Sequence, residues 1–270
     1  MATASYSEAQ LLAALEGVGI APGATMVVHS SLFHLGRLEG VALAESAARI
    51  VALLRDHLGP EGTLAVPASN WDYGRKREPF DLRRSPVTKA LGVLSQQVAA
   101  LPESRRSPNP IFSVAAVGAQ ADFICGGGTA SAMGPDSAWD RLYRLNAENL
   151  FLGCDLTYLS FVRYIEYLCG VPYIYNKLFD VPLYDDGRPL GLTVVTPLRY
   201  AHCPAEHDIS RFEQRLRQRG VLREIVLGGG PVKAVRMDDC FKLGVEALKE
   251  DIHFFLAGPP AYQPGQVPLA

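Results

Sequence analysis

Three polar side chains recur at a spacing of three in a segment that is otherwise apolar and aromatic. Ser160, Arg163 and Glu166 fall within a helix predicted over residues 156–169, where this spacing places them on one face. A hydroxyl, a guanidinium and a carboxylate on one face could bind or orient a polar substrate. The same spacing is also typical of a surface salt bridge, so the pattern leaves both interpretations open.

Small polar residues end an apolar run near the N-terminus. Residues 25–30 predict a buried strand that finishes with His29 and Ser30 and is followed by Ser31. Ligands commonly bind where such strands end, because hydroxyl and backbone N–H groups are available there. The serines could equally do no more than cap the turn.

Aromatic and polar residues alternate directly after the predicted helix. Tyr173, Tyr175 and Lys177 could line a substrate pocket or belong to an edge strand. Further along, the histidines and cysteine near residue 205 match no common zinc spacing, so we expect no metal. These residues are His202, Cys203 and His207, with Asp208 beside them.

A long polar stretch over residues 68–86 carries a local excess of positive charge. Its basic residues are Arg75, Lys76, Arg77, Arg83 and Arg84. Such a cluster could recognise a phosphate group or could lie on a solvated loop. Glycine-rich nucleotide loops, the nucleophile motif of serine hydrolases and the HExxH zinc motif are all absent from the sequence.

Strands alternate with helices through residue 170, which predicts an α/β fold. Expected strands cover residues 25–30, 62–67, 111–118 and 149–153, with helices over 40–58 and 91–101 between them. The last hundred residues resemble an α+β arrangement that packs on the same sheet. We therefore expect one domain over residues 1–270, with an α/β part at about 1–180, an α+β part at about 181–257 and a tail at 258–270.

Composition excludes several classes of protein. The 270 residues are 48% hydrophobic and 20% charged, with a net charge of −2, so a disordered chain and a typical nucleic-acid binder are both disfavoured. No apolar run reaches the length of a membrane helix, and the N-terminus lacks a secretory pattern. Five scattered cysteines favour a reduced, cytoplasmic compartment.

The order of several short motifs is specific when they are taken together. The chain carries Val-His-Ser-Ser-Leu at 28–32, Glu-Gly-Thr-Leu at 61–64 and Leu-Gly-Val-Leu at 91–94. Arg-Ser-Pro-Asn-Pro-Ile-Phe-Ser-Val follows at 106–114, then Asp-Arg-Leu-Tyr at 140–143 and Tyr-Ile-Glu at 164–166. From about residue 25 to 255 the sequence resembles the aminoglycoside 3-N-acetyltransferase family. Two of its segments, Pro-Ile-Phe-Ser-Val and Val-Pro-Tyr-Ile-Tyr-Asn-Lys, look closer to members from surface-sugar or natural-product pathways.

The resemblance implies a single antibiotic N-acetyltransferase-like domain, with a central mixed sheet flanked by helices, and acetyl-CoA as donor. It implies acyl transfer to an amine, catalysed from a helix with a Thr-x-x-His-x-x-Glu pattern, in which the His is the base and the Glu orients it. It places the donor near His29, Ser30, Ser31, Arg106, Ser107 and Ser113. We assign the acceptor to Asp72, Tyr73, Tyr173, Tyr175 and Lys177.

The sequence departs from the family pattern at the catalytic position. Ser160 and Glu166 match the hydroxyl and the carboxylate, but Arg163 occupies the position of the His. An arginine keeps its proton at any ordinary pH and cannot act as a base. Glu166 could be the base if burial raised its pKa, although Arg163 would oppose that shift. Another histidine could supply the base: His29, His34, His202 or His207.

Two further possibilities concern the substrate. The acceptor amine could already be neutral, or Arg163 could bind a carboxylate or phosphate on a different substrate. The basic residues near the expected pocket would repel a polycation, so we expect a neutral or anionic amine on a sugar or natural-product intermediate. Altered chemistry on the same scaffold, with Cys154 as a candidate, and a catalytically silent binding protein remain alternatives. We expect no nucleic-acid or membrane partner, and a homodimer is the protein assembly considered.

Overall fold

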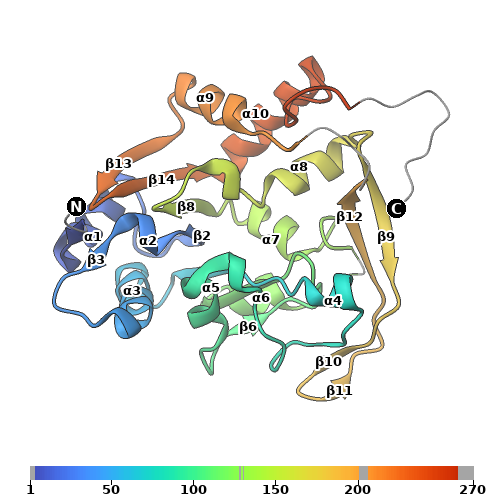
Figure 1. Cartoon of the computed structure of the whole chain (residues 1–270), viewed down its shortest axis with the longest axis horizontal. Helices are drawn as coiled ribbons and strands as arrows, with labels where there is room; N and C mark the ends of the chain where they lie inside the picture. The colour runs from blue at the N-terminus through green and yellow to red at the C-terminus, as the bar shows by residue number, and fades with distance from the viewer. Residues whose placement is uncertain (1–3, 128, 130, 201–205, 261–270) are drawn as a thin grey trace.

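A seven-stranded mixed sheet forms the centre of the molecule. The computed structural model describes residues 4–127, 129, 131–200 and 206–260 (Figure 1). The strand order is β13-β14-β8-β2-β4-β7-β6. In that order the strands are Arg223–Leu227, Gly230–Arg236, Glu148–Leu152, Thr25–Ser30, Thr63–Pro67, Val114–Gly118 and Arg105–Arg106. Strands β8, β2 and β4 are parallel, while β14 and β7 run antiparallel to their neighbours. The predicted α/β class with a central mixed sheet is confirmed.

Apolar residues alternate between the two faces of the sheet. In β2, Val27 joins the hydrophobic cluster on one face, while Met26 and Val28 join the cluster on the other. The face of Met26 is covered by α1 (Glu8–Gly17), α3 (Leu43–Leu58) and α5 (Gly92–Ala99). The face of Val27 is covered by α6 (Ala121–Cys125), α7 (Ala138–Arg144), α8 (Val162–Cys169), α9 (Ser210–Gln218) and α10 (Met237–Glu250). Within the described ranges, no helix is long and apolar enough to cross a membrane.

A two-stranded ribbon lies outside the central sheet, at the opposite end of the molecule from the N-terminal elements (Figure 1). Strands β9 (Ile174–Phe179) and β12 (Val194–Arg199) pair antiparallel, with Ile174 opposite Arg199. The chain between them forms β10 (Leu183–Asp185) and β11 (Arg188–Pro189), and β10 also pairs with β5 (Phe80–Asp81). The shorter elements are β1 (Ser5–Tyr6), β3 (Arg37–Leu38), α2 (Leu32–Leu35), α4 (Asp72–Lys76), η1 (Lys89–Leu91) and η2 (Leu156–Tyr158).

The carboxyl end of β2 lies where the chain changes direction across the sheet. One connection from β2 runs through α3 to β4, and β8 on the other side of β2 is reached through α7. Open α/β sheets bind ligands outside the carboxyl ends of the strands at such a point. Ser30 and Ser31 are therefore at a favourable position for a ligand.

The helix predicted over residues 156–169 is wrong in its first half. Residues 156–158 form the separate 3-10 turn η2, and α8 begins only at Val162. The Asp155 carboxylate accepts the backbone N–H of Thr157, and Leu159 is extended, which interrupts the helix. Ser160 consequently lies in the turn before α8, while Arg163 and Glu166 remain on the helix. Residues 261–270 of the predicted tail, with His202 and Cys203, lie outside the described residues.

Gly153 follows β8 at the same edge of the sheet and has a φ of +70°. A Cβ at this position would clash with the carbonyl oxygen of Ser31. We expect Gly153→Ala to lower the free energy of unfolding by about 2–4 kcal/mol, because a left-handed backbone and a steric clash add. Gly170→Ala is the matched control, since its φ is +65° and a Cβ there meets no described atom within 4 Å. Urea denaturation that gave equal losses for both variants would contradict this account.

Candidate active site

The carboxylate of Glu166 is the centre of a buried polar cluster. Glu166 is fully buried on α8, and its Oε2 accepts a hydrogen bond of 2.7 Å from Nη1 of Arg163. Its Oε1 accepts a hydrogen bond of 2.9 Å from the Tyr173 hydroxyl and lies 3.4 Å from Nε2 of His207. The helical spacing brings Arg163 to Glu166, whereas the fold brings His207 from a distant segment.

Opposing effects determine the protonation of this cluster. Burial alone would raise the pKa of the Glu166 carboxyl, but Arg163 and His207 outweigh it and lower this pKa to about 2. Burial is also the largest influence on His207 and lowers its pKa, against the smaller raising effect of Glu166. Burial and the neighbouring carboxylate raise the pKa of Tyr173 far above its ordinary value, so its hydroxyl keeps the proton. At neutral pH the cluster therefore holds a carboxylate, a guanidinium and a neutral imidazole.

A cavity of about 160 Å³ opens beside this cluster. Arg163 and Glu166 of α8 line this cavity together with Arg199 of β12. The remaining lining is apolar and consists of Phe112, Ile174, Pro197 and Leu198. The Arg163 side chain keeps 23% of its surface exposed while it binds Glu166. The charged groups in the cavity lining are thus two guanidinium groups and one carboxylate.

The other residues assigned to the acceptor are not gathered at this cavity. Lys177 lines a neighbouring pocket of about 330 Å³ with Arg75 and Trp71, and Leu198 contributes to both spaces. Tyr175 stacks on Tyr200 on the β9–β12 ribbon. Half-buried Asp72 is paired with Lys76, and the hydroxyl of buried Tyr73 donates a hydrogen bond to the carbonyl of Val181. Neither side chain lines the cavity: Asp72 forms an ion pair within α4, and Tyr73 belongs to the small core of the ribbon.

The residues assigned to the donor differ in how accessible their polar groups are. His29 is buried and stacked on Phe151, and burial lowers its pKa to about 3. Ser31 is more accessible at the edge of the sheet, and its hydroxyl is 2.8 Å from Nδ1 of His34. Among the described elements, α5 begins close to Ser30, since a Cβ on Gly92 would lie 3.3 Å from the Ser30 carbonyl oxygen.

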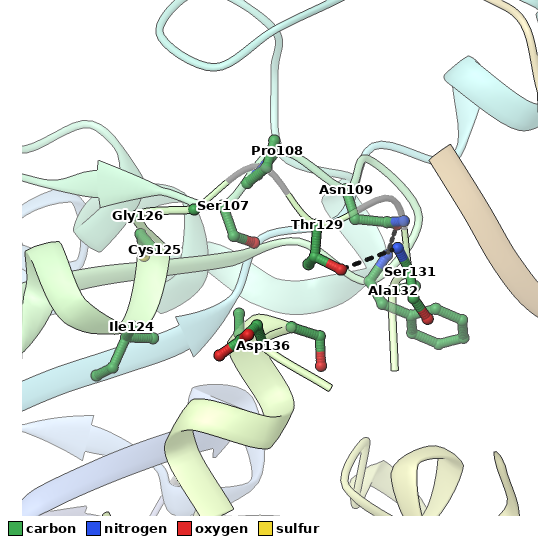
Figure 2. A pocket seen from close by; sticks show the side chains of 14 residues that line it. Ser107, Pro108, Asn109, Ile124, Cys125, Gly126, Thr129, Ser131, Ala132 and Asp136 are labelled. Atoms are coloured by element: carbon green, nitrogen blue, oxygen red, sulfur yellow. Dashed lines mark hydrogen bonds between the residues drawn. The ribbon is translucent and has the colours of Figure 1, made fainter. Parts of the chain in front are cut away.

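Ser107 and Ser113 support a loop next to this edge. The Ser113 hydroxyl donates to the carbonyl of Ser107, and the Ser107 hydroxyl accepts the backbone N–H of Val114. Ser107, Asn109, Thr129 and Asp136 are among the residues that line a narrow crevice, and Figure 2 shows Thr129 near Asn109 and Asp136 below them. Both serine hydroxyls are therefore used within the protein.

A larger pocket of about 450 Å³ adjoins this crevice and carries three arginines, Arg83, Arg105 and Arg106. The guanidinium of Arg106 donates to the carbonyls of Ala68 and Ser85 and lies over the ring of Phe80. Burial lowers the pKa of Arg106 to about 10, so it remains charged at neutral pH. Asp122 and Asp185 also line this pocket, which leaves one net positive charge.

Cys154 is not activated as a nucleophile. The thiol is buried at the carboxyl end of β8, and burial raises its pKa to about 12. A thiol with such a pKa carries almost no thiolate at neutral pH. The described geometry therefore does not favour thiol chemistry at this position.

Sequence reasoning missed Arg199 and the apolar lining of the cavity. Arg199 reaches the cavity because β12 pairs with β9 in a register that sets it opposite Ile174. Only knowledge of this pairing could have identified it. His207 was one of four candidate histidines, and no local spacing distinguishes it.

Comparison with known proteins identifies the family and agrees with the fold. The family model described as aminoglycoside 3-N-acetyltransferase matches residues 27–249. Aminoglycoside N(3)-acetyltransferase IV of Salmonella sp is 30% identical over 255 residues, which cover 94% of this chain and 92% of that protein. A variant of the aminoglycoside acetyltransferase AAC(3)-IVa, solved in complex with a gentamicin, is 28% identical, with a TM-score of 0.79 over 96% of this chain and 94% of that one.

A further solved structure shows the same fold at lower identity. AAC-IIIb, solved as a binary complex with CoASH, has a TM-score of 0.77 and 24% identity and covers 95% of this chain and 100% of that one. The family model spans most of the chain, and the Salmonella relative is similar along nearly its whole length. The chain therefore belongs to the aminoglycoside 3-N-acetyltransferase family and is an acyltransferase.

Proposed function

We propose that this protein is a CoA-dependent N-acyltransferase that moves an acetyl or related acyl group to an amine of a sugar or natural-product intermediate. The acceptor is neutral or anionic apart from its amine, in contrast to a polycationic aminoglycoside. The single observation that carries this proposal is the cavity lined by Arg163 and Arg199.

The charge balance of the cavity disfavours a polycation. Glu166 is the one carboxylate in its described lining, and its charge is already matched by Arg163. Arg199 adds a second guanidinium group to a lining that is otherwise mostly apolar, where charge interactions are strong. A carboxylate or phosphate on the acceptor would be attracted, since guanidinium groups bind such anions well.

The donor is acetyl-CoA or a related thioester in this proposal. The family match supports an acyl donor of this class, and the carboxyl end of β2 is a favourable place for it. The pocket lined by Arg83, Arg105 and Arg106 supplies cations for the phosphates of CoA. Ser30 and Ser31 lie at the edge where the pantetheine arm would pass toward the cavity.

Calorimetry and acyl-transfer assays together test this function. We expect purified protein to bind acetyl-CoA with micromolar affinity and to acetylate glucosamine 6-phosphate more efficiently than glucosamine or gentamicin. Arg199→Gln should lower kcat/KM for the phosphorylated amine by about 10–100-fold, the effect of one charged hydrogen bond. Arg188→Gln is the matched control, because Arg188 is exposed on β11.

Two results would oppose the proposal. Failure to bind acetyl-CoA would remove the donor. If the wild type preferred gentamicin, and Arg199→Gln did not change this preference, the proposed class of acceptor would be wrong. The acyltransferase activity itself would still be supported.

A further inference from the structure

His207 approaches the buried carboxylate of Glu166 from a part of the chain far from α8. Its backbone pairs with Leu256, and the N–H of the next residue, Asp208, donates to the carbonyl of Phe255. The imidazole also packs against the ring of Phe255. The segment that follows α10 therefore holds His207 in place beside Oε1 of Glu166, at 3.4 Å.

Acyl transfer to an amine requires a group that accepts a proton. Arg163 remains protonated, and Tyr173 keeps its proton because its pKa is raised. Glu166, with a pKa of about 2, is too weak a base at neutral pH. His29 is buried and stacked on Phe151, and burial lowers its pKa to about 3, which makes it a weak base.

We propose that His207 is the general base of the reaction and that Glu166 orients it. This inference rests on the proposed acyl transfer. The buried Nε2 of His207 carries the hydrogen that faces Oε1 of Glu166, which leaves Nδ1 as the basic nitrogen. The side chain keeps 15% of its surface exposed, and since Nε2 itself is buried, this surface belongs to the rest of the residue.

The amine nitrogen attacks the thioester carbonyl carbon and forms an N–C bond. One proton of the amine nitrogen passes to Nδ1 of His207. The C–S bond then breaks, and the departing sulfur takes the proton to give CoASH and the amide. The Nε2 contact is long for a hydrogen bond in the described structure, and such contacts commonly tighten when substrate binds.

The charges around His207 set its behaviour with pH. Burial and two arginines disfavour the imidazolium, whereas Glu166 favours it, and the net effect lowers the pKa of His207 below its ordinary 6.5. A base must be deprotonated, so activity should be constant above this pKa and should fall as the pH decreases through it. The charged and titratable groups near the ring are Arg163, Glu166, Tyr173, Arg199 and Asp208.

The first test needs no substrate. Long-range ¹H–¹⁵N NMR spectra of the full-length protein should show His207 neutral at pH 7, with the hydrogen on Nε2 and a titration midpoint below 6.5. In Glu166→Gln this midpoint should fall further, because the attraction of the carboxylate for the imidazolium is lost. A doubly protonated ring at pH 7, or a hydrogen on Nδ1, would overturn the inference.

The second test measures acetyl transfer to glucosamine 6-phosphate. We expect His207→Gln to lower kcat/KM by about 10²–10⁴-fold, with unchanged affinity for acetyl-CoA and with loss of the acidic limb of the pH profile. The matched control is His57→Gln, which changes a histidine on α3 whose ring contacts the carbonyl of Ile20. Near-normal activity in His207→Gln, with its acidic limb intact, would contradict the role of His207.

The two proposals fail in different ways. If the wild-type protein binds no acetyl-CoA and acetylates no amine, the proposed function fails, and the NMR titration still decides whether His207 has the tautomer of a base. If the wild type is active and His207→Gln is equally active, only the inference about His207 fails.

Discussion

Replacing Glu166 with alanine is expected to lower the free energy of unfolding by about 3–5 kcal/mol. The carboxylate is fully buried and compensates Arg163, while it accepts a hydrogen bond from Tyr173. Its removal leaves the partly buried guanidinium of Arg163 and the buried hydroxyl of Tyr173 without their carboxylate partner. Urea denaturation at pH 7 measures the loss. A change below about 1 kcal/mol would show that the cluster adds little to stability.

The pH dependence of stability gives an independent check on the same carboxylate. The pKa of Glu166 falls from its ordinary 4.5 to about 2 in the folded protein. A lowered pKa stabilises the fold above pH 4.5, and this stabilisation, about 3 kcal/mol, is lost as the pH falls from 4.5 toward 2. Glu166→Gln is the control: it keeps the shape of the side chain and should lose less stability between about pH 5 and pH 3 than the wild type.

Replacing Trp139 with alanine is the second large effect, with an expected loss of about 3–5 kcal/mol in the free energy of unfolding. Trp139 is one of the largest fully buried side chains, and it lies on α7 in the cluster that covers the sheet. Its Nε1 donates a hydrogen bond of 2.9 Å to the carbonyl of Phe112, which lines the candidate cavity. The substitution therefore opens a void and also releases part of the cavity wall.

Trp139→Phe separates these two consequences. It retains most of the apolar contact but removes the hydrogen bond to Phe112, so we expect a loss of about 1–3 kcal/mol. We also expect a higher KM for the acceptor with kcat largely retained. The control is Trp71→Phe, since Trp71 is half-buried on the surface of the neighbouring pocket. Equal effects of the two phenylalanine variants on KM would contradict a role for Trp139 in supporting the cavity.

Local patterns account for most of the secondary structure. The apolar run within residues 25–30 predicts a buried strand, and the periodic apolar residues within 40–58 predict the helix α3, which begins at Leu43. These predictions are confirmed because they depend on side chains close together in sequence. The strand expected at 111–118 begins only at Val114, since the Asn109 side chain accepts the N–H groups of Ile111 and Phe112 and holds a turn there.

Some contacts of the candidate site join residues close in sequence, and others join residues far apart. The sequence by itself determined the pair of Arg163 and Glu166, because i and i+3 residues are neighbours on any helix. Only the tertiary structure decided that Arg199 lines the same cavity and that His207 lies beside the same carboxylate. The first depends on the register of β12 against β9, and the second on the pairing of His207 with Leu256. Such contacts join residues far apart in the chain, and no local spacing encodes them, because they form only when the separate elements pack around one core.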